Sequence, residues 1–257
     1  MKMNRTLLLS LIILFGLSLS AVAQKDRNMA IIRSSLHGLE YEVKAGFSIG
    51  GTAPVPLPAE IRSIEGYRPT VAISIEGNAT KWFNQDWGMV VGLRLENKNM
   101  KTDARVKNYN LEMVANDGGH MKGAWTGYVK TNVRNSYLSL PVLATYKFNN
   151  RWRVKGGLYA SYLIDGDFSG SAYDGYLRDQ NPTGEKIYVT EATYDFSDDL
   201  RRFAWGVQLG GEWRAFKHLN VYADLTWGLN DIFKKNFDTI TFAMYPIYLN
   251  MGFGYAF

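Results

Sequence analysis

The last thirteen residues, 245–257, read YPIYLNMGFGYAF and decide the fold. Odd positions in this stretch carry Tyr, Ile, Leu, Met, Phe, Tyr and Phe, whereas even positions carry Pro, Tyr, Asn, Gly, Gly and Ala. Because successive side chains of a β-strand point to opposite faces, one face of this strand is apolar and aromatic and the other is small or polar. Strands that cross a membrane need about 9 to 11 residues and carry aromatic girdles where the apolar band meets water. The stretch therefore predicts a membrane-spanning strand of an outer-membrane β-barrel.

The same alternation recurs in seven earlier stretches of the chain. In residues 39–49, for example, Tyr41 and Val43 alternate with Glu42 and Lys44. The other six stretches are 71–78, 87–96, 137–148, 152–162, 202–214 and 219–230. With the terminal stretch they make eight, and an even number of antiparallel strands closes into a barrel without edges that lipid could not satisfy. We therefore predict an all-β fold, an eight-stranded antiparallel transmembrane β-barrel with short periplasmic turns and long extracellular loops.

The connections between these stretches alternate in length. Three are tight, at 84–86, 149–150 and 216–218, and four are long, at 50–69, 97–136, 165–201 and 230–243. Outer-membrane barrels have short periplasmic turns and longer external loops, so we expect both termini on the periplasmic side. Within the stretch 137–148, Pro141 removes a backbone donor, and we expect a local bulge or a kink toward the lumen there.

The N-terminus has the features of a signal peptide. Lys2 and Arg5 precede an apolar run at 7–19, and the sequence AVA at 21–23 supplies the small residues that signal peptidase accepts. The run of thirteen apolar residues is too short for a retained membrane anchor. We predict cleavage after Ala23 and export to the outer membrane. The predicted organisation is a signal peptide at 1–23, a periplasmic lead-in at 24–38 and the barrel at 39–257.

Composition excludes several classes of protein. The chain has no cysteine, which excludes lipoprotein processing, disulfides and thiolate metal sites. Removing residues 1–23, which contain Lys2 and Arg5 and no acid, lowers the formal net charge from +5 to +3, and this mild excess does not indicate a nucleic-acid partner. No second long apolar run exists, so the pattern is not that of a helical membrane protein.

The even-phase side chains predict a charged lumen. A barrel of eight strands is just wide enough for its own side chains to fill the interior, and a buried charge must be paired to be tolerated there. The predicted network comprises Glu42, Lys44, Glu76, Arg94, Glu96, Lys147, Arg153, Lys155, Arg202, Glu212, Arg214 and Asp224. One interpretation is a structural polar plug. The other is a narrow ion or proton path, in which Glu212, Arg214 and Asp224 are the main candidates.

Three segments resemble the PorT-like outer-membrane β-barrel family of Bacteroidetes. They are NSYLSLPVLATYKF at 135–148, RVKGGLY at 153–159 and GFGYAF at 252–257. The resemblance spans the predicted mature chain, although Ser139 replaces an acid that is usual in the family. It implies a non-enzymatic barrel without cofactors, and the member that gives the family its name is associated with type IX secretion. Tyr255 and Phe257 are then expected to act as the C-terminal signal for the barrel-assembly machinery.

Three functions follow as hypotheses. The first is a non-enzymatic protein that acts by interaction, as a scaffold, a secretion accessory or a surface-binding protein, and the second is a small ion-conducting barrel. The third is a lipid A-modifying enzyme, which would need a histidine base beside a serine and an acid at the lipid-facing rim. The chain has His37, His120 and His218, and none lies at a membrane-facing position of a predicted strand. This favours the non-enzymatic interpretation, with catalytic and metal sites absent.

Two of the predicted external loops carry opposite charge. The basic loop, 97–136, holds Lys98, Lys101, Arg105, Lys107, Lys122, Lys130 and Arg134. The acidic loop, 165–201, holds Asp165, Asp167, Asp174, Asp179, Glu185, Glu191, Asp195, Asp198 and Asp199. The two loops either fold over each other and neutralise, or bind separate partners: lipopolysaccharide phosphates for the cations and Ca²⁺ for the carboxylates. Other expected partners are outer-membrane lipid and secretion-system proteins.

Overall fold

The computed structural model describes residues 38–70, 72–115, 118–179 and 183–257. The predicted signal peptide and nearly all of the lead-in lie outside these residues. The chain separates into two units, Met1–Leu39 and Glu40–Phe257, and the second unit is the β-barrel. Among the described residues, no helix is long and apolar enough to cross a membrane.

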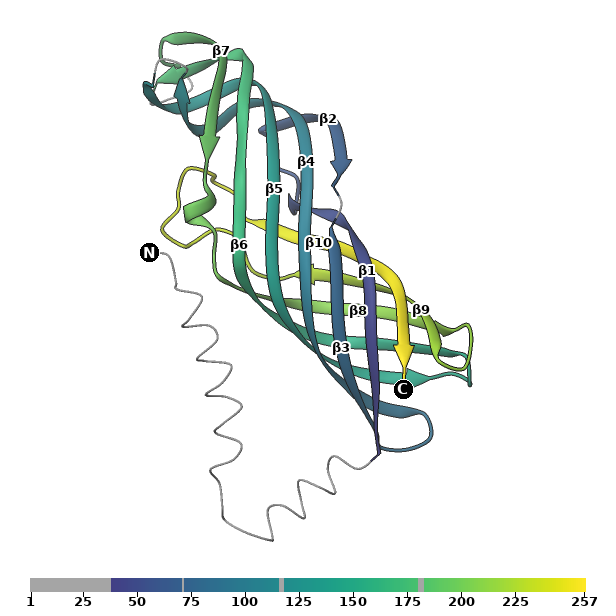
Figure 1. Ribbon diagram of the computed structural model, residues 1–257. Helices are drawn as coiled ribbons and strands as arrows, with labels where there is room; N and C mark the ends of the chain where they lie inside the picture. Colours follow the sequence, from purple (N-terminus) through teal and green to yellow (C-terminus); the bar gives the residue numbers. More distant parts are fainter. Residues whose placement is uncertain (1–37, 71, 116–117, 180–182) are drawn as a thin grey trace, which may run out of the picture. The chain divides into compact units, whose positions relative to one another are not determined.

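Eight strands form a closed ring (Figure 1). They are β1 (Leu39–Pro54), β3 (Ile73–Trp82), β4 (Trp87–Ala115), β5 (His120–Lys147), β6 (Trp152–Asp179), β8 (Phe203–Arg214), β9 (Leu219–Gly228) and β10 (Met244–Ala256). β10 closes the ring onto β1 in an antiparallel ladder from Glu42↔Ala256 to Pro54↔Met244. The predicted fold class is confirmed, and the predicted centres of all eight strands coincide with observed strands.

The wall of the barrel alternates between lipid-facing and lumen-facing side chains. Val43 is 47% exposed and Leu209 is 66% exposed, while their sequence neighbours Lys44 and Gln208 are buried. Exposed aromatic side chains gather at the two ends of this apolar surface. At the end of the tight turns they include Tyr41, Trp87, Phe148, Trp152, Trp213 and Phe257, and at the opposite end Tyr162, Phe203, Trp205 and Trp227. These are the girdles expected where an apolar band meets water.

Two of the tight turns use the same local device. The Asn84 side-chain oxygen accepts hydrogen bonds from the backbone nitrogens of Asp86 (3.0 Å) and Trp87 (2.7 Å). The Asn149 oxygen does the same for the nitrogens of Arg151 (2.8 Å) and Trp152 (2.9 Å). Asparagine side chains stabilise turns in this way because they mimic a backbone carbonyl. By the rule of short periplasmic turns, this end of the barrel faces the periplasm.

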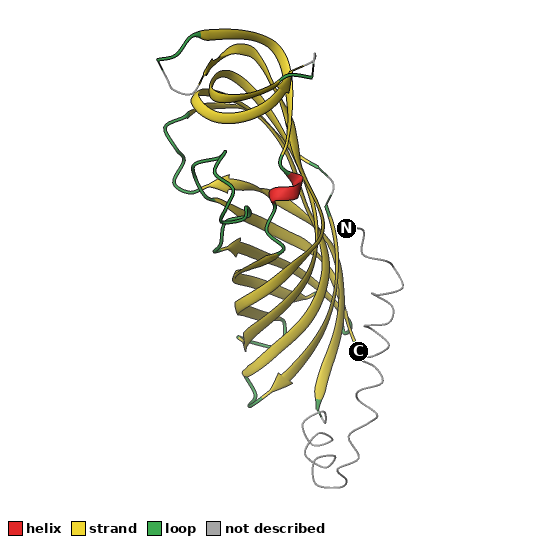
Figure 2. Ribbon diagram, turned by 90° about the vertical axis from the view of Figure 1, so that its left-hand side faces the viewer, coloured by secondary structure: helices red, strands yellow, loops and turns green. Residues whose placement is uncertain are grey.

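At the other end, three strands continue far beyond the barrel wall. β4, β5 and β6 curl over and are joined there by β2 (Ile61–Pro69), by β7 (Lys186–Asp195) and by a short 3₁₀ helix, η1 (Ser197–Asp199), as Figure 2 shows. β2 pairs with β4, and β7 pairs with β6 and meets the tip of β4 at Val114↔Thr193. We call this part the head: β2, β7, η1, residues 229–243, and residues 100–115, 120–134 and 166–179 of the three long strands.

The prediction that 97–136 and 165–201 are loops is therefore wrong, because both segments are mostly β-strand. The period of two continues through them: Val129 and Val133 are buried, and the intervening positions Lys130 and Asn132 are not. The outward positions of these extensions carry polar side chains, whereas those of the barrel wall carry apolar side chains that face lipid. The extensions therefore lack the apolar face by which the membrane strands are predicted. Of the other long connections, 50–69 contains the end of β1 and β2, while 230–243 is a loop.

The head has a hydrophobic core of its own. The core includes Trp125 and Val133 of β5, Phe168 and Leu177 of β6, and Phe233 of the loop before β10. Phe233 packs edge-on against Phe168 at 5.0 Å between ring centroids. Burying a large apolar side chain contributes about 1.5 to 3 kcal/mol, so the head is a packed structure and not a set of independent loops.

Pro141 does not cause the predicted bulge. The β4–β5 ladder runs from Leu95↔Leu138 and Arg94↔Ser139 to Val91↔Val142, and its register is the same on both sides of Pro141. The ladder shows no pairs at Leu140 and Pro141, as expected where a proline cannot donate. The register shift in this ladder lies instead between Val106 and Tyr109, in the head.

Candidate functional site

The barrel lumen holds a network of buried charges. Its members are the acids Glu42, Glu76, Glu96, Glu212 and Asp224 and the bases Lys44, Arg94, Lys98, Arg153 and Lys155. Five acids face five bases, so the network is formally neutral. Each of the ten has an oppositely charged partner within 4 Å. This pairing is what allows charges to remain ionised away from water.

At the turn end of the lumen, Arg153 and Lys155 of β6 bind two carboxylates. Arg153 bridges Glu42 of β1, at 3.2 Å, and Glu212 of β8, and Lys155 Nζ lies 2.6 Å from Glu212. Asn220 of β9 donates its side-chain nitrogen to Glu42 at 2.7 Å. Side chains of four strands, β1, β6, β8 and β9, are thus joined in the lumen.

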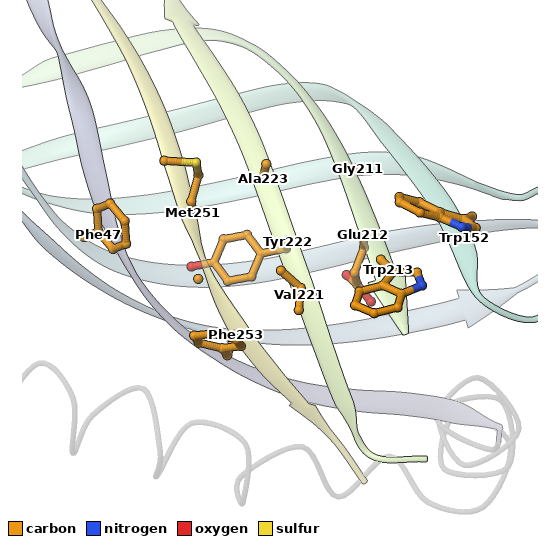
Figure 3. A pocket seen from close by; sticks show the side chains of 11 residues that line it. Phe47, Trp152, Gly211, Glu212, Trp213, Val221, Tyr222, Ala223, Met251 and Phe253 are labelled. Carbon is orange, nitrogen blue, oxygen red and sulfur yellow. The ribbon is translucent and has the colours of Figure 1, made fainter. Parts of the chain in front are cut away.

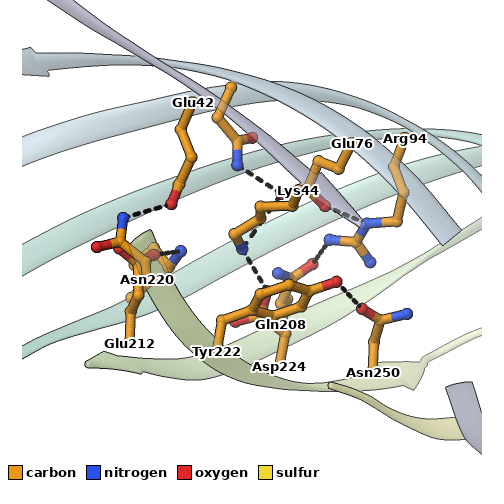
Figure 4. A network of polar contacts seen from close by, with 12 residues as sticks. Glu42, Lys44, Glu76, Arg94, Gln208, Glu212, Asn220, Tyr222, Asp224 and Asn250 are labelled. Atoms are coloured by element: carbon orange, nitrogen blue, oxygen red, sulfur yellow. Dashed lines mark hydrogen bonds and ion pairs between the residues drawn. The ribbon is translucent and has the colours of Figure 1, made fainter. Parts of the chain in front are cut away.

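In the middle of the lumen, Lys44 is the centre of the contacts (Figure 4). Its Nζ lies 2.8 Å from Asp224 and 3.5 Å from Glu76, and 4.1 Å from the centre of the Tyr222 ring. Arg94 pairs with Glu76 on the neighbouring strand and donates to Gln208 across the lumen at 2.7 Å. The side chains fill the space between opposite walls.

At the head end, Lys98 closes the network. Its Nζ lies 3.3 Å from Glu96 and faces the rings of Tyr137, Tyr159 and Tyr248 at 5.0 to 5.8 Å from their centres. Ser139 donates to Glu96 at 2.6 Å and also bonds Ser161. Ser139, which replaces the acid that is usual in the PorT-like family, therefore lies in the lumen beside Glu96, an acid of the neighbouring strand β4.

Nine of the twelve predicted lumen residues lie in this network, and three do not. Lys147 is only partly buried, with its Nζ 4.1 Å from the centre of the Trp82 ring. Arg214 is half-buried beside the turn, and Arg202 is exposed outside β8. Arg202 precedes the strand by one residue, so the alternation that would direct it inward has not yet begun.

Sequence reasoning missed Lys98 as a lumen residue. It follows Arg94 and Glu96 in the same phase of β4, but the predicted strand ends at 96 and the prediction places Lys98 in the basic loop. Extending the alternation from Glu96 by two residues predicts that Lys98 also faces the lumen. The uncharged partners Gln208, Asn220 and Asn250 are also buried in the lumen.

The outer wall has a hollow of about 480 Å³ over β8, β9 and β10 (Figure 3). Gly211, Ala223, Trp152, Trp213 and Phe253 are among the residues that line it. A β-carbon at Gly211 would meet no atom within 4 Å. The lining is apolar and belongs to the surface that lipid covers.

Two hollows lie in the described part of the head. One, of about 330 Å³, is lined by Glu112, His120, Asp195, Asp199 and Asp238 together with apolar side chains of the head core. Within the described part of the chain, no group of three or more histidine or acidic side chains is arranged to hold a metal ion. The second hollow, of about 360 Å³, is lined by Glu65, Gly66, Arg68, Lys101, Thr102, Asp103, Lys130, Thr131, Asn132, Gly170 and Ser171.

The cations of the predicted basic loop are dispersed. Lys101 and Lys130 line the second hollow with Arg68 of β2. Lys122 Nζ lies 3.5 Å from a carboxylate oxygen of Asp238, in the 230–243 loop. It also lies 3.8 Å from a carboxylate oxygen of Glu112, on the neighbouring strand of the β4–β5 hairpin. Arg134 lies opposite Asp167 in the β5–β6 ladder.

The described histidines have structural contacts. His218 Nδ1 lies 2.7 Å from the carbonyl oxygen of Ala256, and its ring stacks on Tyr255 with 5.5 Å between centroids. The nearby acid Glu212 of β8 points into the lumen and pairs there with Arg153 and Lys155, so it is not a partner for His218. His120 lies at the tip of β5 in the head, and His37 is outside the described residues.

The predicted assembly signal lies at the turn end. Tyr255 and Phe257 are exposed and contact each other edge-on at 5.2 Å. The backbone nitrogen of Phe257 donates to the carbonyl of Tyr41 at 3.0 Å, and that of Ala256 to His218 at 2.9 Å. The C-terminal strand is thus held on both sides, and recognition of its aromatics by the assembly machinery remains a prediction.

Comparison with solved structures finds several similar chains. It is similar to the structure of Ail, the attachment invasion locus protein of Yersinia pestis, with a TM-score of 0.37 and 11% identity over 85% of this chain and 97% of that one. It is also similar to OprG of Pseudomonas aeruginosa, with a TM-score of 0.32 and 16% identity over 85% of this chain and 95% of that one. Neisserial surface protein A matches with a TM-score of 0.30 and 10% identity over 86% of this chain and 97% of that one. No curated protein sequence matches.

A family model described as "Outer membrane protein beta-barrel domain" matches residues 22–234. The match covers most of the chain and includes seven of the eight barrel strands described above. The protein therefore belongs to the outer membrane protein beta-barrel domain family.

Proposed function

We propose that this protein is a non-enzymatic surface-binding protein of the outer membrane, in which the barrel is the anchor and the head is the binding part. The observation that carries the proposal is the extension of β4, β5 and β6 into a head with its own hydrophobic core. A barrel that served only as an anchor would need no such structure. Segments that are held rigidly on a scaffold are where binding residues are commonly found.

The lumen supports this division of roles. Its ten charged side chains are paired with one another across the interior, and the aromatic contacts of Lys98 lie between this network and the head core. An ion path would require these pairs to open, and each broken buried pair costs about 3 to 5 kcal/mol. The polar plug is therefore the interpretation that we favour over the ion-conducting barrel.

The proposal is tested by site-specific photo-crosslinking in living cells. A photoreactive amino acid replaces Tyr188, which is 76% exposed in the head, or Phe216, which is 72% exposed at the turn end. Leu209, which faces lipid and is 66% exposed, is the control for adducts with membrane lipid. We expect a defined adduct from position 188 that is absent from 216 and 209. Adducts from 216 alone would overturn the proposal and favour a periplasmic partner.

A role in type IX secretion is the second candidate, and it rests on the PorT-like segments at 135–148, 153–159 and 252–257. The three segments lie in β5, β6 and β10 of the barrel wall. Deleting the gene and comparing periplasmic and secreted proteins by quantitative mass spectrometry tests this role. Accumulation of cargo in the periplasm would support it, and an unchanged secretome would exclude it.

A further inference from the structure

The second hollow of the head has the composition of a site for a charged, hydroxylated ligand. Its volume of about 360 Å³ lies in the range of small-molecule sites. Three cations, Arg68, Lys101 and Lys130, converge there from β2, β4 and β5. Asn132 pairs with Lys101 and Ser171 pairs with Lys130 in the ladders, so the amide and the hydroxyl of these two residues lie on the same face of the sheet as the cations.

The cations of this hollow are available to a ligand. Among the described residues, Arg68 and Lys101 make no salt bridge and no side-chain hydrogen bond, and both are exposed. Their backbones pair directly, so the two side chains share one end of the hollow. Lys130 has its Nζ 4.2 Å from the centre of the Tyr173 ring. This contact holds the ammonium group in place without neutralising it.

The acids of the hollow are already engaged. The Tyr173 hydroxyl donates to both carboxylate oxygens of Asp103 at 2.9 Å. Burial and the hydrogen bond to Asp103 raise the pKa of Tyr173 to about 12, so the hydroxyl remains a neutral donor. Ser63 donates to Glu65 in the same way. The same tyrosine therefore restrains Asp103 and positions Lys130 without cancelling the charge of either. Three cations face two carboxylates, so the hollow carries an excess of one positive charge.

The height of the hollow above the membrane narrows the choice of ligand. Leu95 is the last exposed apolar residue of β4 before the head, and Lys101 follows it by six positions. At about 3.3 Å per residue this places Lys101 about 20 Å further along the strand, and because barrel strands tilt by about 35 to 45° the rise above the last lipid-facing side chain is about 15 Å. A ligand bound there lies above the acyl chains of the membrane. The cations and the hydroxyl and amide groups of the hollow require a ligand with anionic groups and hydroxyls. A phosphorylated sugar of the outer leaflet meets both conditions.

We propose that this hollow binds the phosphorylated core sugars of lipopolysaccharide in the surrounding leaflet. Arg68 and Lys101 contact phosphate, with Lys130 as the third cation, because charge-assisted hydrogen bonds to phosphate are the strongest that such side chains form. Asn132 and Ser171 contact sugar hydroxyls. The inference rests on the proposed function, since it names the ligand of the head.

The test uses the mature full-length protein in detergent and a water-soluble probe. The probe is the phosphorylated core oligosaccharide obtained by removing all acyl chains from lipopolysaccharide, and binding is measured by isothermal titration calorimetry. Each charge-assisted contact is worth about 1.5 to 3 kcal/mol, so the double variant Lys101→Ala/Lys130→Ala should bind at least about tenfold more weakly than the parent protein. Chemically dephosphorylated oligosaccharide should bind the parent protein with a similar loss.

A matched control separates the hollow from overall charge. Lys107→Ala/Lys235→Ala removes two exposed lysines that do not line the hollow and lowers the net charge by the same amount. We expect this control to bind within about twofold of the parent protein. Equal weakening in both double variants, or undiminished binding of dephosphorylated oligosaccharide, would overturn the proposal. Melting temperatures equal to that of the parent protein show that both variants are folded.

The outcome can be separated from that of the proposed function. If the hollow variants bind the oligosaccharide like the parent protein while Tyr188 still gives an adduct in cells, the head binds another partner and only the ligand assignment fails. If the Tyr188 position gives no adduct and the oligosaccharide binds equally to all variants, both proposals fail. Binding of the free oligosaccharide but not of lipopolysaccharide in vesicles would exclude the surrounding leaflet as the source.

Discussion

At the scale of residues, the lumen depends on individual partners. Asp224 has Lys44 as its salt-bridge partner among the described residues, at 2.8 Å, and both side chains are 1% exposed. Glu76 has two cationic partners and Glu212 has two as well. Loss of Lys44 should therefore affect Asp224 more than any other acid, since an unpaired buried charge cannot be solvated.

We expect Lys44→Met to lower the free energy of unfolding by about 3 to 5 kcal/mol, because it leaves Asp224 buried and unpaired. Lys44→Met/Asp224→Leu should recover part of this loss. Urea unfolding of the refolded barrel, followed by tryptophan fluorescence, measures both. Lys217→Met in the exposed turn is the control, with an expected change below about 0.5 kcal/mol. A double variant less stable than Lys44→Met would contradict the pairing.

Substitutions at two adjacent glycines of β8, Gly210 and Gly211, test which face of the strand points into the lumen and which points to lipid. A β-carbon at Gly210 would overlap the carboxylate of Asp224 in the lumen, whereas one at Gly211 would meet nothing within 4 Å on the lipid side. Gly210→Ala should therefore destabilise the barrel by about 1 to 3 kcal/mol through overpacking. Gly211→Ala should leave stability unchanged or slightly higher. The same unfolding assay compares the two variants, and the opposite order of stabilities would mean that the strand faces are inverted.

At the scale of elements, prediction succeeded for the barrel strands and failed for the head. The tight turns and all eight strand centres follow from local signals, namely the period of two and the Asn residues at turns such as Asn84 and Asn149. The extensions of β4, β5 and β6 follow the same period, but their outward positions are polar. A strand that faces water on one side and a protein core on the other lacks the apolar outward face that identifies a membrane strand, so the pattern predicts a loop there.

The turn device can be tested at Asn149. Asn149→Ala removes the acceptor of two backbone hydrogen bonds and should destabilise the barrel by about 1 to 3 kcal/mol. Asn150→Ala, in the same turn, removes a side chain that is exposed and should change stability by less than about 0.5 kcal/mol. Unfolding midpoints in urea compare the two. Equal effects would show that the turn does not depend on the Asn149 side chain.

The head core can be tested at Phe233. This ring is 1% exposed and stacks on Phe237 at 4.6 Å between centroids. Phe233→Ala should cost about 3 to 5 kcal/mol locally, so limited proteolysis should cleave the head while the barrel strands stay protected. Phe216→Ala, at a site that is 72% exposed, is the control and should show the proteolysis pattern of the parent protein. Cleavage throughout the barrel of Phe233→Ala would show that head and barrel unfold together.

At the scale of the whole molecule, the lumen network and the head core together close the barrel. Tyr137, one of the three tyrosines around Lys98, is itself a member of the hydrophobic core, and Met100 of that core follows Lys98 by two residues on β4. We expect the purified protein in planar bilayers to show no conductance above that of the bare membrane, because the interior is filled by paired side chains. Stepwise currents that Lys44→Met increases would contradict the plug and support an ion path.

The sequence by itself determined the closed eight-stranded barrel, its orientation by turn length and the polar character of its lumen. These depend on the alternation of side chains along each strand, which is a local property that any single strand displays. Only the tertiary structure decided which acid meets which base, because pairs such as Lys44 with Asp224 join residues that are 180 positions apart. It also decided that the external segments curl into a head, since burial of Val133 and Phe233 in one core requires contacts between distant strands and loops.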